Sequence, residues 1–491
     1  MPNDFHLMTA TELARMIATR EVSPVEVVQA SLERIRQVDG QLNSFITVLD
    51  ERAIAGARRA EVAVLAGEPL GPLHGVPVAI KDCVQLAGVP TTYGVRSRLH
   101  AIAEETSPDV ERLEQAGAIV VGTTNMPEFG HKAVTDNHLV GATSTPFDLA
   151  KNAGGSSGGS AAAVGGCIVP LAHSGDGGGS TRIPAALCGV YGLKPSFGRI
   201  PAVNRPDAFE FALPMVCQGP MARTVEDAAL MLQVVAGPHP GDPLSLPAED
   251  VDYAAAARGG LRGKRAAFCR SFGETPISPD VAAVVADAVR RLDEAGVAVD
   301  EVEIDLGAST ERLLESWKRG ASMVYVAAVE TMRRQGVDLL GELSQEVSQS
   351  FMQYVRRGHD LTALEHRMEN ALRTGVFDAF QGVLADYDFI LSPTLAVAGV
   401  DNVAGGETVG PTSVNGVAID PVGGWTLCFP ANFTGQPAAS IPAGFTDENL
   451  PVGLQIVGRR FRDDEVLAVS GVLERAKPWY EGYRSRLAVA V

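Results

Sequence analysis

The sequence has few of the features that mark secreted, membrane-spanning or metal-binding chains. Its six cysteines include no C-x-x-C pair, which argues against a zinc site and a disulfide framework and favours a reducing compartment. The first residues lack a basic start followed by an apolar segment, so we expect no signal peptide. The most apolar stretch, residues 161–172, is interrupted by glycine and proline and is shorter than the roughly 20 residues that span a bilayer. These absences predict a cytoplasmic protein with no metal site and no membrane contact.

Positive charge is also in short supply. The chain has 41 basic and 59 acidic residues, which gives a formal net charge of -18. This negative excess repels polyanions, and we therefore expect no nucleic-acid partner. With 46% hydrophobic and 20% charged residues over 491 positions, the composition is that of an ordinary globular protein with a large core.

Short apolar runs alternate with helical patterns along the chain. Serine–proline pairs at 23–24, 107–108 and 278–279 predict helix starts, because serine caps a helix N-terminus and proline suits the first helical position. Residues 309–386 are predicted to be mostly helix. The alternation predicts an α/β fold built on a mixed sheet. The predicted strands are 76–80, 118–122, 167–172, 264–268, 297–304, 388–392 and 451–458.

The stretch KNAGGSSGGSAAAVGG, residues 151–166, places three serines on a glycine-rich backbone. A flexible linker is disfavoured because the stretch runs directly into an apolar segment. A phosphate cradle requires G-x-x-x-x-G-K-[ST] or G-x-G-x-x-G after a strand, and neither pattern is present. Residues 154–158 match G-x-S-x-G, the nucleophile elbow of α/β-hydrolases. That fold needs a histidine late in the chain, however, and the last 125 residues contain none.

A second glycine–serine cluster follows at residues 173–200, where three glycines at 177–179 lead directly into Ser180. Successive glycines let backbone N–H groups converge on one point, which is how an oxyanion hole is built. Lys81 ends the apolar run VPVAI, and a lysine at the end of a buried strand can lose its charge and act as a base. Each element alone is also compatible with an ordinary turn or a solvated strand end. Their combination favours nucleophilic catalysis by serine.

Taken in order, IKD (80–82), GGSSGGSAAAV (154–164) and GDGGGSTRIPAALCGVYGLKPSFGR (175–199) resemble the amidase signature family. The resemblance implies a single amidase domain over residues 1–491, with the signature core at 70–235 and a variable, mostly helical substrate-side region at 240–385. It implies a central mixed, twisted sheet with helices on both faces and the helical region over the active site. Further stretches that fit the family are 11–35, 72–82, 123–130, 219–232, 386–394, 434–445 and 451–461.

The resemblance also implies a Ser–cis-Ser–Lys triad. Ser180 is then the nucleophile, Ser156 the bridging serine and Lys81 the base. Ser156 and Ser180 are 24 residues apart, which is the interval of the family and selects Ser156 over Ser157. The peptide bond between Gly155 and Ser156 is accordingly expected to be cis.

The surroundings of the nucleophile are assigned by the same resemblance. The backbone N–H groups of Gly177, Gly178 and Gly179 are expected to form the oxyanion hole. The family commonly has isoleucine or threonine at the position of Gly177, so we expect a looser loop or more room there. Three supporting residues are expected to hold the loop by hydrogen bonds or ion pairing: Ser157, Asp176 and Arg182.

The implied reaction is hydrolysis of a carboxylic amide C–N bond through an acyl-Ser180 intermediate, with no cofactor. The small-molecule substrate is an acyl or aryl amide, a carbamate or an oligoamide, and a homodimer is the expectation for the family. His173 is expected to pack behind the nucleophile loop. Four residues are expected to line the substrate pocket: His131, Trp317, Trp425 and Phe433.

Two other functions fit the sequence less well. The glutaminase subunit of a tRNA-dependent amidotransferase shares the fold and the triad and passes ammonia to partner subunits. The continuation PAVNRPDAFEF, residues 201–211, lacks the tyrosine associated with those subunits and disfavours this alternative. A binding protein on an inactive amidase scaffold is disfavoured because all three triad positions are intact.

Overall fold

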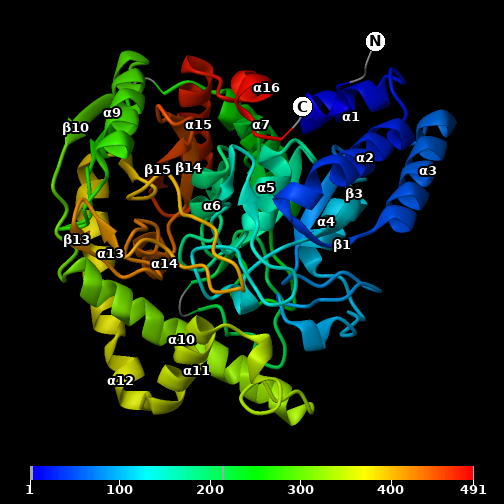
Figure 1. Cartoon of the computed structure of the whole chain (residues 1–491). Coiled ribbons are helices and arrows are strands. Elements are labelled where there is room, and N and C mark those ends of the chain that lie inside the picture. Colours follow the sequence, from blue (N-terminus) through cyan, green and yellow to red (C-terminus); the bar gives the residue numbers. More distant parts are fainter. Residues whose placement is uncertain (1–3, 213–214, 262, 490–491) are drawn as a thin grey trace.

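A mixed β-sheet forms the centre of the molecule (Figure 1). The computed structural model describes residues 4–212, 215–261 and 263–489. Over these residues the sheet has eleven strands in the order β1-β3-β2-β6-β8-β7-β14-β15-β11-β9-β10. β2 runs parallel to β3 and β6, and β9 runs parallel to β10 and β11, while the other neighbours are antiparallel. The strands are β1 (Phe45–Val48), β2 (Pro77–Lys81), β3 (Ile119–Thr124), β6 (Leu171–Asp176), β7 (Tyr191–Lys194), β8 (Cys217–Ala222), β9 (Arg265–Phe268), β10 (Ala298–Glu301), β11 (Phe389–Pro393), β14 (Ala438–Phe445) and β15 (Pro451–Gly458).

Alternate residues of the central strands face opposite layers of the protein. Val78 and Ile80 of β2 pack into one apolar cluster, whereas Ala79 packs into another. In β11, Leu391 joins the first of these clusters and Ile390 joins a third. Because successive side chains of a strand point to opposite faces, a sheet with apolar residues at consecutive positions must be covered on both sides. This confirms the predicted α/β fold with helices on both faces.

Two sets of helices provide that cover. One face is covered by α1, α4, α7, α8, α9 and α15. The other is covered by α2, α3 and α5 next to β2, and by α10, α13 and α14 next to β11. The helices are α1 (Ala10–Ala18), α2 (Pro24–Leu42), α3 (Asp50–Ala66), α4 (Pro108–Gln115), α5 (Gly158–Gly165), α6 (Arg182–Leu187), α7 (Val225–Val235), α8 (Tyr253–Arg258), α9 (Pro279–Glu294), α10 (Thr310–Arg334), α11 (Gln349–Asp360), α12 (Ala363–Met368), α13 (Asn370–Asp386), α14 (Pro430–Thr434), α15 (Asp463–Ala476) and α16 (Tyr483–Arg486). Among the described residues, no helix has both the length and the apolar character needed to cross a membrane.

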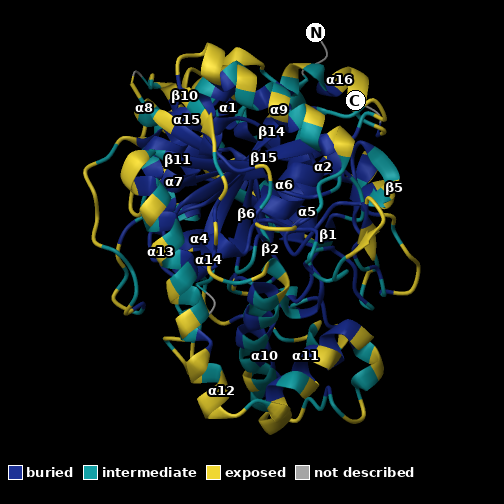
Figure 2. Cartoon of the chain, turned by 90° about the vertical axis from the view of Figure 1, so that its left-hand side faces the viewer, coloured by how far each residue is buried: buried dark blue, intermediate teal, exposed yellow. Residues whose placement is uncertain are grey.

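The helices α10, α11 and α12 gather at one end of the molecule (Figure 1). They have an apolar cluster of their own, in which Tyr325 and Val329 of α10 meet Phe351 and Val355 of α11. Val95, from the loop after β2, belongs to the same cluster. The interior faces of α10 and α11 are buried, whereas α12 is largely exposed (Figure 2). The helical region therefore packs onto the loops that leave one edge of the sheet.

Most of the predicted elements are present. The helix starts are confirmed, with Ser23, Ser107 and Ser278 as the N-caps of α2, α4 and α9. The run 167–172 is only partly strand: β6 begins at Leu171, because the chain turns before it at Cys167, whose φ is 56°. Four strands of the sheet, β1, β7, β8 and β14, lie outside the predicted runs. Two short hairpins complete the structure: β4 (Ser144–Thr145) with β5 (Asp148–Asn152), and β12 (Ser413–Val414) with β13 (Val417–Ala418).

Candidate active site

The carboxyl ends of two neighbouring parallel strands bring the predicted catalytic segments together. Lys81 is the last residue of β2 and Asp176 the last of β6, and the two strands pair in parallel. The loop that follows β6 carries Ser180. The backbone N–H of Ser157 donates to the carbonyl of Ser180 at 3.1 Å, which joins the segment before α5 to that loop. Open α/β sheets commonly place their sites at such an edge.

Lys81 and Ser156 are in direct contact. The Nζ atom of Lys81 lies 2.7 Å from the Oγ atom of Ser156, and both side chains are buried. Burial lowers the pKa of Lys81, and the neighbouring Cys83 and Asp176 oppose this effect only in part. A desolvated lysine favours the neutral amine, which can accept a proton. The peptide bond that precedes Ser156 is cis, as expected.

Gly130 lies directly against the hydroxyl group of Ser156. A Cβ atom at this position would be 2.9 Å from Ser156 Oγ, and the φ of Gly130 is +73°. The preceding residue, Phe129, also has a positive φ of 53°, which is uncommon for a bulky side chain. The turn at 129–130 therefore approaches the bridging serine closely. Neither residue was predicted from the sequence to belong to the site, although the two end the stretch 123–130 that fits the family.

Asp176 and Arg182 form a fully buried ion pair at the base of the nucleophile loop. The Nε and Nη2 atoms of Arg182 donate to the two carboxylate oxygens, each at 2.9 Å, and Asn432 donates to the same carboxylate at 3.0 Å. Burial raises the pKa of Asp176, but Arg182, together with Lys194 and Asn432, outweighs burial and brings this pKa to about 2. Asp176 is therefore ionised at neutral pH and ties the end of β6 to the start of α6.

The three loop glycines do not all have the predicted role. The N–H of Gly179 donates to Asp176 Oδ1 at 2.8 Å, so it is not free for a substrate, and its assignment to the oxyanion hole is wrong. Glycine is needed there for another reason: φ is +119°, and a Cβ atom would lie 2.4 Å from the Cβ of Cys428. Within the described ranges, no acceptor takes the N–H of Gly177 or Gly178. These two groups remain as candidate donors to an oxyanion.

The loop is firmly held at Gly177, contrary to the expectation of a looser segment. The indole Nε1 of Trp317 donates to the carbonyl of Gly177 at 2.8 Å. There is also little room beside this residue, since a Cβ atom on Gly177 would lie 3.2 Å from Cγ2 of Val216. Trp317 is partly exposed. Of the four residues predicted to line the pocket, it is the one that contacts the catalytic loop.

Trp425 and Phe433 are core residues and not pocket residues. Trp425 has no exposed surface, and its indole N–H donates to the carbonyl of Pro421 at 3.2 Å. Phe433 packs against Phe429 with the two rings nearly perpendicular, inside the cluster formed by α10, α13 and α14. Side chains with almost no surface open to solvent offer almost none to a substrate. The prediction that these two residues line the pocket is wrong.

His131 is also completely buried. Its Nδ1 atom lies 2.8 Å from the carbonyl oxygen of Glu128, and its Nε2 atom lies 2.8 Å from Ser350 Oγ. Burial lowers its pKa well below the ordinary value, so the ring is neutral, and its predicted substrate contact is wrong. His173 lies on β6 with its Nε2 atom 2.8 Å from Asp109 Oδ2, and both side chains are buried. This pair is a structural contact of the strand that carries the loop.

Three aromatic rings that were not predicted from the sequence form a row centred on Phe129, the residue before Gly130. Phe129 stacks between Tyr93 and Phe351, with ring centroids 5.7 Å and 5.0 Å apart. Tyr93 and Phe129 are partly exposed, whereas Phe351 of α11 is buried. Phe129 and Trp317 pack at the margin of the same apolar cluster. The rings therefore form an aromatic stack on the turn whose Gly130 approaches the bridging serine.

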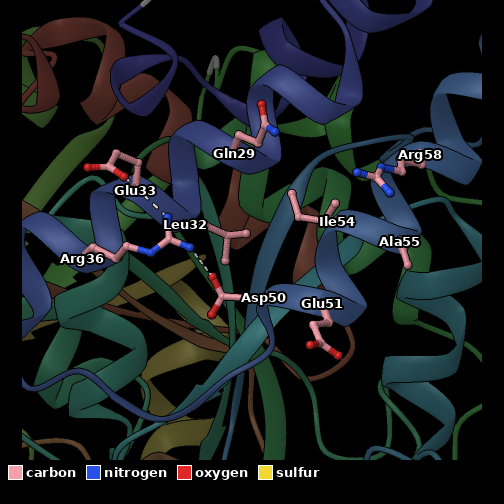
Figure 3. Close-up of a pocket in the computed structure, with 9 residues that line it drawn as sticks. All are labelled: Gln29, Leu32, Glu33, Arg36, Asp50, Glu51, Ile54, Ala55 and Arg58. Atoms are coloured by element: carbon pink, nitrogen blue, oxygen red, sulfur yellow. Dashed lines mark hydrogen bonds and ion pairs between the residues drawn. The ribbon is translucent and has the colours of Figure 1, made fainter.

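A separate groove of about 640 Å³ lies between α2 and α3 (Figure 3). Arg36 reaches between Glu33 and Asp50 and forms an ion pair with each. None of the three triad residues lines the groove, and we do not assign it to the reaction. Its lining residues are Gln29, Leu32, Glu33, Arg36, Asp50, Glu51, Ile54, Ala55 and Arg58.

The fold and the site together define a class of enzyme: a hydrolase with a serine as the candidate nucleophile and a lysine as the candidate base. In the part of the chain that the structure describes, no group of three or more histidine, cysteine, aspartate or glutamate residues is placed to hold a metal ion. The chain belongs to the amidase family, whose model, described as Amidase, matches residues 26–467. The predicted family and fold class are thereby confirmed, and the protein is an enzyme that hydrolyses amide C–N bonds.

Three relatives show how far the similarity extends. An acylamidase from Rhodococcus erythropolis is 36% identical over 480 residues, which cover 97% of each chain. The crystal structure of a bacterial aryl acylamidase of the amidase signature family superposes with a TM-score of 0.95 at 36% identity and covers 99% of this chain and 100% of that one. One subunit of the glutamyl-tRNA(Gln) amidotransferase from Acaryochloris marina is 33% identical over 486 residues, covering 96% of this chain and 98% of the relative.

Proposed function

We propose that the protein hydrolyses amides through an acyl-enzyme on Ser180, with Ser156 as the proton relay and Lys81 as the base. The observation that carries this proposal is the buried 2.7 Å contact between Lys81 Nζ and Ser156 Oγ. A solvated lysine is protonated at neutral pH, whereas a desolvated one can hold the free amine that general base catalysis requires. Ser180 is partly exposed, as a nucleophile that meets its substrate must be.

The reaction follows from these positions. Ser180 Oγ attacks the amide carbon while its proton passes to Ser156, and the proton of Ser156 passes to Lys81. The N–H groups of Gly177 and Gly178 stabilise the negative oxygen of the tetrahedral intermediate. When the C–N bond breaks, a proton returns through Ser156 to the departing amine, and the acyl group remains as an ester on Ser180. Water hydrolyses this ester by the same relay and restores all three side chains.

For the substrate we propose an aryl amide. Tyr93 and Phe129 present partly exposed rings beside Gly130, which contacts the bridging serine. Aromatic faces bind aromatic groups by stacking, so an anilide ring has a surface to lie on next to the scissile bond. A relative described as a bacterial aryl acylamidase, with a TM-score of 0.95, supports the same substrate class. Fatty amides, carbamates and oligoamides are the competing classes.

Amine release from a panel of amides tests this substrate class. The panel contains 4-nitroacetanilide, acetamide, a primary fatty amide, an N-aryl carbamate, a cyclic oligoamide and glutamine. We expect the highest kcat/KM with the anilide. A preference for acetamide or the fatty amide over the anilide would contradict the aryl assignment and leave the triad standing.

The alternative is a glutaminase that serves an amidotransferase. The relative from Acaryochloris marina, at 33% identity over nearly the full length, is the observation that keeps this function in consideration. Glutamine as the preferred substrate, with ammonia release that depends on added partner subunits, would support it. The homodimer and the cytoplasmic location stay predictions from the sequence; sedimentation of the purified chain tests the first, and fractionation of the source cells tests the second.

A further inference from the structure

Trp317 contacts the oxyanion loop in two ways. Its indole N–H donates to the carbonyl of Gly177 at 2.8 Å. The ring also lies against the next residue, since a Cβ atom on Gly178 would be 2.6 Å from Cζ2 and 2.7 Å from Cε2 of the indole. Trp317 belongs to α10, from the helical region, whereas the loop belongs to the signature core. One side chain therefore touches both residues whose N–H groups are left for the substrate.

The contact at Gly177 determines where the next N–H points. The peptide bond between Gly177 and Gly178 is trans, and in a trans peptide the carbonyl and the N–H point in opposite directions. With the carbonyl held by Trp317, the N–H of Gly178 faces away from the indole. Within the described part of the chain this N–H has no acceptor. On the other side of the loop, Asp176 holds the N–H of Gly179 at 2.8 Å.

We propose that Trp317 is a positioning residue for the oxyanion hole: by holding the Gly177 carbonyl, it aims the Gly178 N–H at the substrate oxygen. The proposal rests on the acyl-Ser180 mechanism proposed above. Asp176 and Trp317 then hold the loop at Gly179 and at Gly177, and the Gly178 N–H between them is directed at the reacting carbonyl. A preorganised donor of this kind stabilises the transition state more than the ground state.

The same contact explains why residue 178 is glycine. Gly178 is not among the glycines with a positive φ, so its backbone conformation is open to an alanine. The space a Cβ would need is instead occupied by the indole of Trp317. Residue 178 must therefore be glycine because the indole of Trp317 excludes a larger side chain. Substitutions at 178 and 317 should have non-additive effects on kcat.

The first test is Trp317→Phe, which keeps an aromatic ring but removes the N–H donor together with part of the bicyclic indole. A neutral hydrogen bond has a modest net value, so we expect kcat to fall about 3- to 10-fold. KM for 4-nitroacetanilide is expected to stay within about twofold, because the ground-state contact of the ring is retained. Trp425→Phe is the matched control: it also loses an indole N–H bond, to Pro421, and is expected to keep the wild-type kcat. A rise in KM with unchanged kcat would overturn the proposal, because Trp317 would then be a substrate contact only.

The second test measures Gly178→Ala in two backgrounds, the wild type and Trp317→Ala. In the wild-type background the added methyl group displaces the rigid indole, and we expect kcat to fall at least about 10-fold. In a Trp317→Ala background the space is open, and the same substitution is expected to cost less than about threefold. Equal losses in the two backgrounds, or a Gly178→Ala enzyme with the wild-type kcat, would overturn the proposal. Ser180→Ala is measured in parallel: if that variant keeps its activity, the failure lies in the proposed mechanism and not in the role of Trp317.

Discussion

Asp176 and Arg182 lie six residues apart and face each other, fully buried, through two hydrogen bonds of 2.9 Å. The same carboxylate accepts the N–H of Gly179 at 2.8 Å. One ion pair therefore joins the last residue of β6, the nucleophile loop and the first residue of α6. Because the Asp176 carboxylate holds all three segments, we expect the loop to keep its conformation only while this carboxylate is ionised and paired with Arg182.

Asp176→Asn should lower both stability and activity. Removing one partner of a buried ion pair costs about 3–5 kcal/mol in the free energy of unfolding, and a catalytic group displaced by about 1 Å costs on the order of 10²-fold in rate. Chemical denaturation and kcat on the folded fraction measure the two effects. Asp109→Asn, at the buried pair with His173, where Nε2 lies 2.8 Å from Oδ2, is the control. It is expected to lose stability and keep its kcat, and an equal loss of kcat would contradict the role of the loop.

The free energy of unfolding should depend on pH through the titration of the Asp176 carboxylate. Burial raises and Arg182 lowers the pKa of Asp176, with a net value of about 2, while an unfolded aspartate titrates near 4. A group whose pKa is lower in the folded state contributes stability that is complete above pH about 4 and is lost as the pH falls toward 2. Denaturation midpoints of wild type and Asp176→Asn should therefore converge over this range. Curves that stay parallel from pH 6 to pH 2 would contradict the assignment.

The pH dependence of kcat/KM should report the lowered pKa of Lys81. Burial lowers its pKa, and the base must be neutral, so kcat/KM is expected to rise tenfold per pH unit and then level off below the ordinary lysine value of about 10.4. Lys81→Arg keeps a cation that does not deprotonate in proteins and is expected to be inactive at every pH. A profile of the wild-type enzyme that still rises at pH 10 would show that Lys81 is protonated in the free enzyme.

Gly130→Ala tests the close approach to the bridging serine. The new Cβ would lie 2.9 Å from Ser156 Oγ at a φ of +73°, so we expect a displaced hydroxyl and a loss on the order of 10²-fold in kcat. Gly67 offers a close control, because its φ is also +73° and nothing lies within 4 Å of the added atom. Gly67→Ala should cost about 1–2 kcal/mol of stability through its backbone alone and leave kcat unchanged. Similar kinetics for the two variants would refute the contact.

Phe129→Leu tests the aromatic stack. Stacking between aromatic groups contributes about 0.5–1.5 kcal/mol beyond burial, so kcat/KM for 4-nitroacetanilide should fall about 2- to 12-fold, with little change for acetamide. Phe461→Leu is the matched control, since Phe461 is also a solvent-accessible phenylalanine with a positive φ. An equal fall for the two substrates would mean that Phe129 shapes the turn and does not bind the aryl ring.

Long motifs allowed the triad positions to be predicted. The residues that line the substrate pocket could not be predicted, because their exposure depends on packing between distant segments. Lys81 and Ser156 were assigned from the resemblance to the amidase signature family, and the structure places them in contact. Trp317 and Trp425 look alike in sequence, yet packing between distant segments leaves one on the catalytic loop and the other fully buried. The stack at Phe129 includes Phe351 from α11, which lies more than 200 positions later in the sequence. A local sequence pattern cannot predict such a contact.

Gly179 shows a second limit of sequence reasoning. Three consecutive glycines predict converging N–H groups, but only the structure shows that Asp176 already takes one of them. The pattern of short apolar runs predicted strands on both sides of the sheet centre: β3, β2 and β6 on one side, and β15, β11, β9 and β10 on the other. It missed β7 and β8, where glycine, proline and polar residues stand among buried positions and break the usual apolar pattern.

The most direct test of the account is to trap the acyl group on the enzyme. Wild-type protein is mixed with 4-nitrophenyl acetate, quenched in acid and examined by intact mass and peptide mapping. We expect one acetyl group, located on Ser180, together with a burst of 4-nitrophenol equal to the enzyme concentration. Ser180→Ala should show neither the adduct nor the burst and should not release amine from any amide of the panel. An acetyl group on another residue, or amide hydrolysis by Ser180→Ala, would contradict the assignment of the nucleophile.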